Sequence, residues 1–516
     1  MTPWCSFRTA FLAGVLLLQP VLGSRAQEIS QSVPVGTLTG TPLRNAGGGR
    51  GGGKGARGGR QSPDGVITDA RQLFKTDVPA HPLDVVLGRP TRDSVTASVL
   101  SYADREGKIE YGAGPGNLPE KTEPFPLKAG EPREIVLSGL TPDTLYRYRL
   151  LTREESGPWT PGEECSFQTQ RRSGEPFTFT LQADPHLDYN TEPAMYLLSL
   201  SNALSASPDF HIDLGDTFMT DKHRFRETAA AQYLAQRFYF GQIAHSAPLF
   251  LTLGNHDGES GRWLDGTGDN MAVWANAHRK RYFPDPVPDG FYTGNKVPDP
   301  KAGLLQDYYA WEWGDALFVV LDPFWYSAPR RGNEDGWSRT LGRTQYDWLQ
   351  ETLEKSTAKY KFVFIHHLVG GFGKDSRGGA EAAPFFEWGG ENPDGTPGFA
   401  EKRPGWPMPI HDLLVRNGVS IVFHGHDHLF VKQDLDGIVY QEVPQPGYPR
   451  HDNTRSAEEY GYRGGLLLGS PGHLRIRVGS EAARVDYIRS VLPCDEKQTF
   501  TNGAVAASYE VPPHKP

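Results

Sequence analysis

Imidazole, carboxylate and amide side chains follow five apolar stretches of this sequence, each at the point where the stretch ends. The last stretch, residues 421–423, is followed by His426 and His428, with Gly425 just before them. Two imidazoles one residue apart can face a single ion where a glycine lets the backbone turn sharply. One such pair is a weak signal on its own. Four earlier stretches end in the same way, with Asp184 and His186, with Asp216, with Asn255, His256 and Asp257, and with His366 and His367.

These residue types indicate a metal centre with hydrolytic chemistry. Histidine nitrogens combined with carboxylate and amide oxygens suit first-row transition metals, and the set lacks the thiolates of structural zinc sites. Asp216 follows a glycine, where a carboxylate can bridge two cations with its two oxygens. Two ions about 3.5–4 Å apart hold both the attacking and the leaving oxygen of an in-line displacement. The pattern therefore predicts a two-metal hydrolytic site.

The elements that would position these residues alternate between strands and helices. Apolar runs predict strands at residues 177–182, 210–214, 249–253, 361–365 and 421–423, and the segments between them predict helices at residues 195–206, 225–243, 344–355 and 409–417. This alternation is typical of an α/β layer fold, in which ligands gather beyond the carboxyl ends of strands. We therefore expect the five polar clusters to meet at one edge of a sheet.

A small all-β module is predicted ahead of the α/β domain. Short alternating runs such as residues 94–99 and 134–137 are separated by turn-rich segments. Residues 140–150 resemble fibronectin type III domains, with Tyr146 in the place of the tyrosine-corner residue. We expect a signal peptide at residues 1–26, a flexible linker at 27–79, the sandwich at 80–172, the α/β domain at 175–490 and a C-terminal tail at 491–516.

The first residues have the pattern of an export signal. Arg8 precedes an apolar core at residues 11–18, and Ser24 and Ala26 offer small side chains for cleavage. The core is too short to span a bilayer, and Pro20 interrupts it. We therefore expect an exported protein, periplasmic, cell-surface or extracellular, with no transmembrane helix in the mature chain.

Composition limits the partners of the chain. A net charge of −9 over 516 residues argues against nucleic-acid binding, and the basic, glycine-rich run at residues 45–60 is interpreted as a solvated tether rather than as a site for anionic surfaces. Three cysteines exclude a disulfide scaffold. After export Cys165 and Cys494 could pair, and the sequence leaves that pairing open, as it does the oligomeric state.

The five clusters together resemble the motif set of the calcineurin-like metallophosphoesterase superfamily. Its pattern D-x-H, G-D, G-N-H-[DE], H and G-H-x-H is met in order within residues 177–486. The preceding sandwich is similar to the architecture of purple acid phosphatases, although those carry D-x-G first and a ligand tyrosine where this chain has Met219. The resemblance implies a four-layer α/β/β/α domain with one metal held by Asp184, His186, Asp216 and His428, and a second held by Asp216, Asn255, His366 and His426.

The resemblance also implies the reaction. A metal-bridged hydroxide would attack phosphorus in a small phosphate ester, and His256, a catalytic residue that is not a ligand, would stabilise the developing charge and protonate the leaving oxygen. Asp257 is expected to orient His256. The ions would be two divalent or mixed-valence transition metals, Fe, Mn or Zn. A phosphodiesterase acting on nucleotides or lipid head groups remains an alternative, as do a catalytically silent binding module and a metal-dependent oxygenase.

Further candidates lie around the motifs. His367 is expected to support the ligand His366 from outside the metal sphere. Arg279 and Arg281, in a basic run after the third motif, and Arg377, in a glycine-rich loop after the fourth, are candidates for contact with the phosphate. A solvated helix face is the competing interpretation of the basic run.

Overall fold

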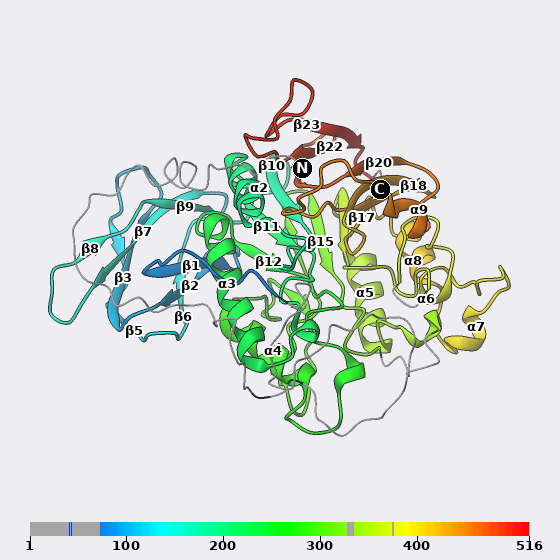
Figure 1. Ribbon diagram of the computed structural model, residues 1–516, viewed down its shortest axis with the longest axis horizontal. Coiled ribbons are helices and arrows are strands. Elements are labelled where there is room, and N and C mark those ends of the chain that lie inside the picture. Colours follow the sequence, from blue (N-terminus) through cyan, green and yellow to red (C-terminus); the bar gives the residue numbers. More distant parts are fainter. Residues whose placement is uncertain (1–40, 42, 44–72, 328–334, 374–375, 515–516) are drawn as a thin grey trace.

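Residues 41, 43, 73–327, 335–373 and 376–514 are described by the computed structural model (Figure 1). The predicted signal peptide and the glycine-rich run lie outside them. Within them, no helix is both long enough and apolar enough to cross a membrane.

The amino-terminal part consists of two antiparallel sheets that face each other. One sheet has the order β1 (Leu83–Gly88), β2 (Ser94–Ser101), β6 (Arg133–Ser138). The other runs β4 (Glu120–Lys121), β3 (Arg105–Gly112), β7 (Leu145–Arg153), β8 (Thr160–Pro161), with β5 (Phe125–Leu127) on β3 and β9 (Cys165–Gln168) on β7. Alternate residues such as Val95, Ile109 and Tyr148 point inward and form one apolar core.

Two larger sheets follow, and the predicted strands are distributed between them. The first has the order β12 (Leu249–Leu251), β11 (Phe210–Asp213), β10 (Phe177–Gln182), β21 (Gly472–Val478), β22 (Ala483–Arg489), β23 (Val505–Val511). The second runs β13 (Thr293–Gly294), β14 (Tyr309–Trp313), β15 (Ala316–Val320), β16 (Tyr360–Phe364), β17 (Ile421–His424), β19 (Ile438–Glu442), β18 (Leu429–Leu435), β20 (Leu466–Gly469). All five predicted strands are present, within a few residues of the expected bounds.

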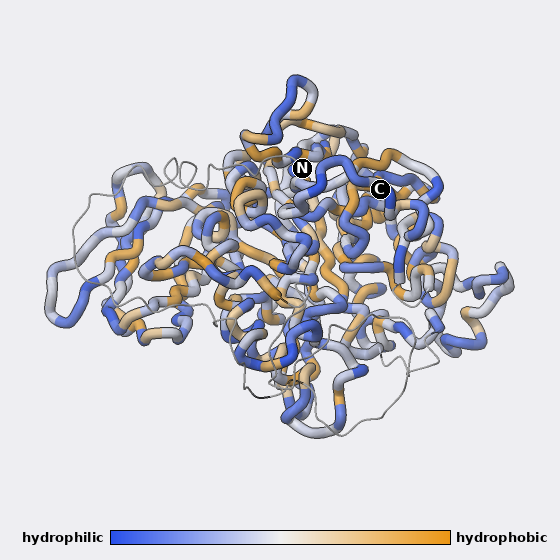
Figure 2. Tube along the Cα trace, viewed as in Figure 1, coloured by the Kyte–Doolittle hydropathy of each residue, from blue (hydrophilic) through white to orange (hydrophobic). Residues whose placement is uncertain are grey.

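An aromatic core fills the space between the two large sheets. Phe179 and Phe210 of the first sheet meet Phe318, Phe364 and Phe423 of the second, and all five are fully buried. The hydropathy colouring shows the apolar segments concentrated along these central strands (Figure 2). Because strands β10, β11 and β12 are parallel, as are β15, β16, β17 and β19, their carboxyl ends lie at common sheet edges.

Helices cover the outer faces of both sheets, which makes the predicted four layers. Over the first sheet lie α2 (Pro193–Ser205) and α3 (Arg226–Ala244), with α4 (Met271–Tyr282) against α3. Over the second lie α5 (Arg343–Lys355) and α8 (Ile410–Arg416), whose Leu349 and Leu413 pack on its outer face. Short elements complete the chain: η2 (Thr220–Lys222), η3 (Gly261–Trp263), η4 (Gly336–Ser338), α6 (Phe386–Gly389), α7 (Phe399–Lys402) and α9 (Ser456–Glu459).

The C-terminal residues do not form the expected tail outside the α/β domain. Residues 505–511 form β23, which pairs with β22 along its length, and Val511 belongs to the aromatic core. The strand reads VAASYEV, with only a serine and a glutamate as polar residues and one buried position, so it shows neither a clear alternation nor a long apolar run. The two cysteines at Cys165 and Cys494 are not joined in a disulfide.

A fully buried arginine fastens the sandwich to the α/β domain. Arg237, on α3, donates hydrogen bonds to the hydroxyl and carbonyl oxygens of Ser98 at 2.9 Å, to the carbonyl of Asp84 at 3.3 Å, and to the carbonyl of Tyr282. Burial lowers the pKa of its guanidinium, although the nearby Asp84 opposes that shift. Arg237 therefore joins helix α3 of the α/β domain to strands β1 and β2 of the sandwich through buried hydrogen bonds.

Replacing Arg237 by methionine is therefore expected to lower the free energy of unfolding by about 2–4 kcal/mol, since several buried acceptors lose their donors. Chemical denaturation followed by fluorescence measures the change. The control is Arg281→Met, because Arg281 is exposed, its hydrogen bond to the carbonyl of Gly130 is long at 3.4 Å, and its guanidinium lies over the ring of Tyr282. Equal losses in the two variants would contradict the role given to Arg237.

Candidate metal centre

The predicted ligands sit on tight turns just beyond the strand ends. Asp184, His186, Asp216, His426 and His428 all have positive φ, between 26° and 81°. For residues other than glycine this conformation costs on the order of 1–3 kcal/mol each and persists where the surroundings enforce it. The turns let side chains from both sheets converge instead of following the strand directions.

Glycines allow these turns to approach one another. A Cβ on Gly254 would lie 2.0 Å from the backbone nitrogen of Asp216, and one on Gly425 would lie 2.9 Å from Oδ2 of Asp184. Both distances are shorter than a carbon can approach, so only glycine fits. The glycines before Asn255 and His426 are therefore required by the closeness of the ligand turns.

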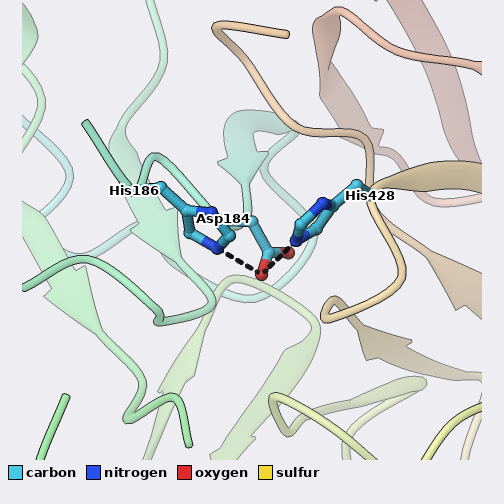
Figure 3. Close-up of side chains that lie close together, drawn as sticks. All are labelled: Asp184, His186 and His428. Carbon is cyan, nitrogen blue, oxygen red and sulfur yellow. Dashed lines mark ion pairs between the residues drawn. The ribbon is translucent and has the colours of Figure 1, made fainter. Parts of the chain in front are cut away.

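One group of candidate ligands consists of Asp184, His186 and His428, whose ligand atoms all lie within 4.8 Å of one another. Nε2 of His186 and Nε2 of His428 each lie 3.4 Å from Oδ1 of Asp184. The close-up shows both rings directed toward this oxygen (Figure 3). Asp188, which the sequence did not single out, lies 3.6 Å from the other nitrogen of His186.

A second group consists of Asp216, His366 and His426, also within 4.8 Å of one another. Nε2 of His366 lies 3.4 Å from Oδ2 of Asp216 and 3.0 Å from Oδ1 of Asn255. Asp216 also connects the two groups, because its Oδ2 lies 3.7 Å from Nε2 of His186. The seven predicted ligands therefore meet at one place, with Asp216 between the two groups.

The donor set fits metal cations. Among the described residues, Oδ1 of Asp184 and both ring nitrogens of His186 are buried without hydrogen-bond partners. Nδ1 of His366 donates to the carbonyl of Leu214 at 2.8 Å, so Nε2 is the ring nitrogen that faces Asp216 and is placed to bind a cation. Burial opposes protonation of His366, yet Asp216 and Asp184 raise its pKa to about 9. The site therefore attracts positive charge, as a metal centre requires.

His256 is oriented by Asp221, not by Asp257 as the sequence suggested. Nδ1 of His256 lies 3.0 Å from Oδ1 of Asp221, while 22% of the His256 side chain is exposed. Burial opposes ionisation of Asp221, but the charge of His256 holds its pKa below the ordinary value. Asp221 is thus an ionised acceptor that fixes the proton of His256 on Nδ1. The signal for this partner was a second aspartate five residues after Asp216.

Asp257 supports the backbone instead. Its carboxylate accepts hydrogen bonds from the backbone nitrogens of Gly254 at 2.8 Å, Asp216 at 3.1 Å and Phe218 at 2.7 Å. Burial and the neighbouring Asp216 raise its pKa to about 8. These three hydrogen bonds to backbone nitrogens hold two ligand turns together, and the ring of His256 is bonded to Asp221.

Arg262 is a cationic group at this site that sequence reasoning missed. One of its amino groups donates to Oδ2 of Asp221 at 3.0 Å and to the carbonyl of Asn255 at 3.4 Å, and 35% of its side chain is exposed. It lies on η3, seven residues after Asn255, where no periodic pattern drew attention to it. Asp221 therefore binds the imidazole of His256 with one carboxylate oxygen and the guanidinium of Arg262 with the other.

The three arginines expected to bind phosphate have other contacts. Arg279 is 1% exposed and is held by Glu259 and Asp285, so the prediction of substrate contact is wrong. Arg281 contacts the sandwich carbonyl of Gly130. Arg377 donates to the carbonyl of His426 at 2.6 Å and to Asp427 at 2.8 Å, which fixes the turn of that ligand.

His367 lies where a supporting residue was expected. Its ring is buried, with centroid distances of 5.9 Å to the ring of His366 and 5.2 Å to that of His426. Nδ1 lies 2.9 Å from the carbonyl of Leu368. The residue packs beside the ligands, and His366 is the imidazole that faces Asp216.

Comparisons with known proteins agree with this geometry. Residues 177–430 match the family described as calcineurin-like phosphoesterase. The fold is similar to that of PhoD, with a TM-score of 0.59 and 15% identity over 83% of this chain and 89% of that one. It is also similar to the purple acid phosphatase PPD1 from yellow lupin (Lupinus luteus) seeds, with a TM-score of 0.55 and 16% identity over 84% and 74% of the two chains. No curated protein matches the sequence.

The fold and the clustered ligands define a metal-dependent phosphoesterase, an enzyme class whose members use divalent metal ions. Residues 177–430 therefore match a calcineurin-like phosphoesterase domain, and together with the sheet-rich region that precedes it they give a fold similar to that of the purple acid phosphatase PPD1.

Asp221→Asn is expected to lower kcat about 10- to 100-fold without changing the metal content, because the substitution weakens the orientation of His256 and removes none of the candidate ligands. The loss should be larger for alkyl phosphates than for nitrophenyl phosphates, since poor leaving groups depend on a proton donor. Steady-state kinetics and metal counting measure both effects.

The contrasting variant is Asp257→Asn, which places an amide donor against backbone nitrogens. It should lower the free energy of unfolding by about 1–3 kcal/mol and reduce metal content, without dependence on the leaving group. Leaving-group dependence in Asp257→Asn but not in Asp221→Asn would return the orienting role to Asp257.

Proposed function

We propose that this protein is an exported phosphomonoesterase with a dinuclear metal centre. The observation that carries the proposal is the pair of ligand groups adjoining at Asp216, with the partly exposed ring of His256 beside them. In this assignment one ion is held by Asp184, His186, Asp216 and His428, and the other by Asp216, Asn255, His366 and His426. The metals would be Fe, Mn or Zn, whose preferences the nitrogen and oxygen donors match.

The chemistry divides between the ions and the chain. Bound at these donors, the ions supply Lewis-acid activation of water and neutralise phosphoryl charge. His256 has its Nδ1 proton fixed on Asp221, so Nε2 is the ring atom available to the substrate. In the protonated imidazole, Nε2 also carries a proton, so it donates a hydrogen bond to a phosphoryl oxygen and then passes that proton to the leaving oxygen. Arg262 shares the charge of Asp221 and keeps that carboxylate in place.

The complete ligand set favours an active enzyme over a silent binding module. A binding module has no need to hold strained turns, buried carboxylates and an oriented, exposed imidazole together.

The sheet-rich region supports a further proposal, a fibronectin type III-like sandwich. The hydroxyl of Tyr146 accepts a hydrogen bond from the backbone nitrogen of Thr141 at 2.9 Å, the contact expected of a tyrosine corner.

The test of function is a paired assay of metal-reconstituted protein on p-nitrophenyl phosphate and bis-p-nitrophenyl phosphate. We expect the higher kcat/KM for the monoester. Asp216→Ala should abolish activity with loss of metal, whereas His256→Ala should lower kcat about 10²- to 10⁴-fold with both ions retained.

Each outcome of this assay is informative. A higher kcat/KM for the diester would make the protein a phosphodiesterase and overturn the monoester assignment. Absence of hydrolysis of both esters, with two ions bound, would favour the binding module. Loss of metal in His256→Ala would show that His256 is a ligand.

Export is tested by the mature protein itself. Cleavage after Ala26 should leave Gln27 as the first residue of the protein recovered outside the cytoplasm, as the small residues at Ser24 and Ala26 predict. Intact-mass measurement of that protein checks the site. Recovery of uncleaved chain from the cytoplasmic fraction alone would contradict the proposal.

A further inference from the structure

A short segment ahead of the sandwich contacts the turns that carry the metal centre. Residues 73–78 precede β1, and the blue segment there extends from the sandwich toward the α/β domain (Figure 1). The sequence assigned this stretch to a flexible linker. Its contacts instead reach the turn after His186 and the turn after Asp221.

Two residues of this segment grip the turn after His186. The backbone nitrogen of Lys75 donates to the carbonyl of Leu187 at 2.7 Å, and its ammonium group donates to the carbonyl of Thr191. Val78 packs against the apolar cluster that contains the fully buried Leu187. Lys75 therefore bonds the turn at Leu187 and again at Thr191, although residues 73–78 form no helix or strand.

A third residue reaches the same turn through a buried relay. The ring of Phe74 stacks on His223, with centroids 4.0 Å apart and an angle of 26° between the planes. Nε2 of His223 donates to Oε1 of Gln232 at 2.7 Å. The amide nitrogen of Gln232 then donates to the carbonyl of His186 at 2.6 Å and to that of Thr217 at 2.9 Å.

The turn has a physical need for these restraints. Asp184, His186 and Leu187 have φ values of 60°, 26° and 58°, and none of them is glycine. Residues in such conformations relax toward ordinary ones unless the surrounding structure over-determines them. Three left-handed residues within four positions make this turn dependent on contacts from outside it.

We propose that residues 73–78 act as a strap that positions His186, with Phe74 and Lys75 as positioning residues. The strap holds the strained turn in the geometry in which His186 faces Asp184. Its effect on catalysis rests on the proposed two-ion function, whereas its effect on the turn does not.

The experiment compares Phe74→Ala with wild type in two ways that do not require activity. Hydrogen exchange of the metal-free protein should be about tenfold faster in peptides covering residues 184–191, because the relay through His223 is lost. Titration with Mn²⁺ alone should show one of two ions bound about tenfold more weakly, as for other residues that orient ligands. Phe74→Tyr, which keeps the ring, should restore both values.

The matched control is Leu43→Ala. Leu43 is buried, and it packs on Ala229 and Met271 of the helices, outside the apolar cluster that contains Leu187. It should lower stability without changing exchange in residues 184–191. If Phe74→Ala does not fold, Phe74→Leu keeps the bulk without the stacking surface and carries the same expectation.

Unchanged exchange and unchanged Mn²⁺ binding in the Phe74 variants would overturn the strap. Equal changes in Leu43→Ala would also overturn it, because the effect would then be general destabilisation. Faster exchange and weaker Mn²⁺ binding in an enzyme that hydrolyses no phosphate ester would leave the strap standing and refute the proposed function alone.

Discussion

The structure depends on two carboxylates that are withdrawn from water. Asp184 and Asp216 are 0% and 1% exposed, and they lie where turns from separate strands meet. Burying an anion without compensation is costly, so such groups are paired or coordinate metal ions. Three imidazoles within 4 Å of them provide part of the compensation. The two buried carboxylates favour positive charge at this place, which suits a cation, and the surrounding structure keeps the two groups close together.

Keeping them close requires backbone that would not adopt its conformation alone. Each ligand turn has its own support: Asp257 binds the nitrogens around Asp216, Gln232 binds the carbonyl of His186, and Arg377 binds the carbonyl of His426. In each case a side chain from elsewhere completes the hydrogen bonding of a strained turn. The candidate centre is therefore preorganised by side chains that bond the backbone of the ligand turns, so a change in one of them alters the geometry of the turn directly.

The strands, the main helices and the positions of the seven candidate ligands were predictable from the sequence because each has a local signal. Apolar periodicity marks the strands, and a polar cluster directly after a strand marks a site residue. The partners of those residues had no such signal. Asp221 and Asp257 are both aspartates near His256, and only the fold shows that one faces its ring and the other faces backbone nitrogens. Arg279 shows the same limit, because a basic run on a helix does not reveal the buried Glu259 opposite it.

The sandwich also supports the candidate metal centre, because it restrains helix α3. Arg237 fixes it to α3, and the hydroxyl of Tyr148 donates to the carbonyl of His245 at the end of that helix. Helix α3 also carries Gln232, which holds His186. Helix α3 therefore connects the two places, because its Arg237 bonds the sandwich and its Gln232 bonds the turn that carries His186. A domain tethered only by a flexible chain would leave α3 free on that side, and the turn carrying His186 would lose a rigid base.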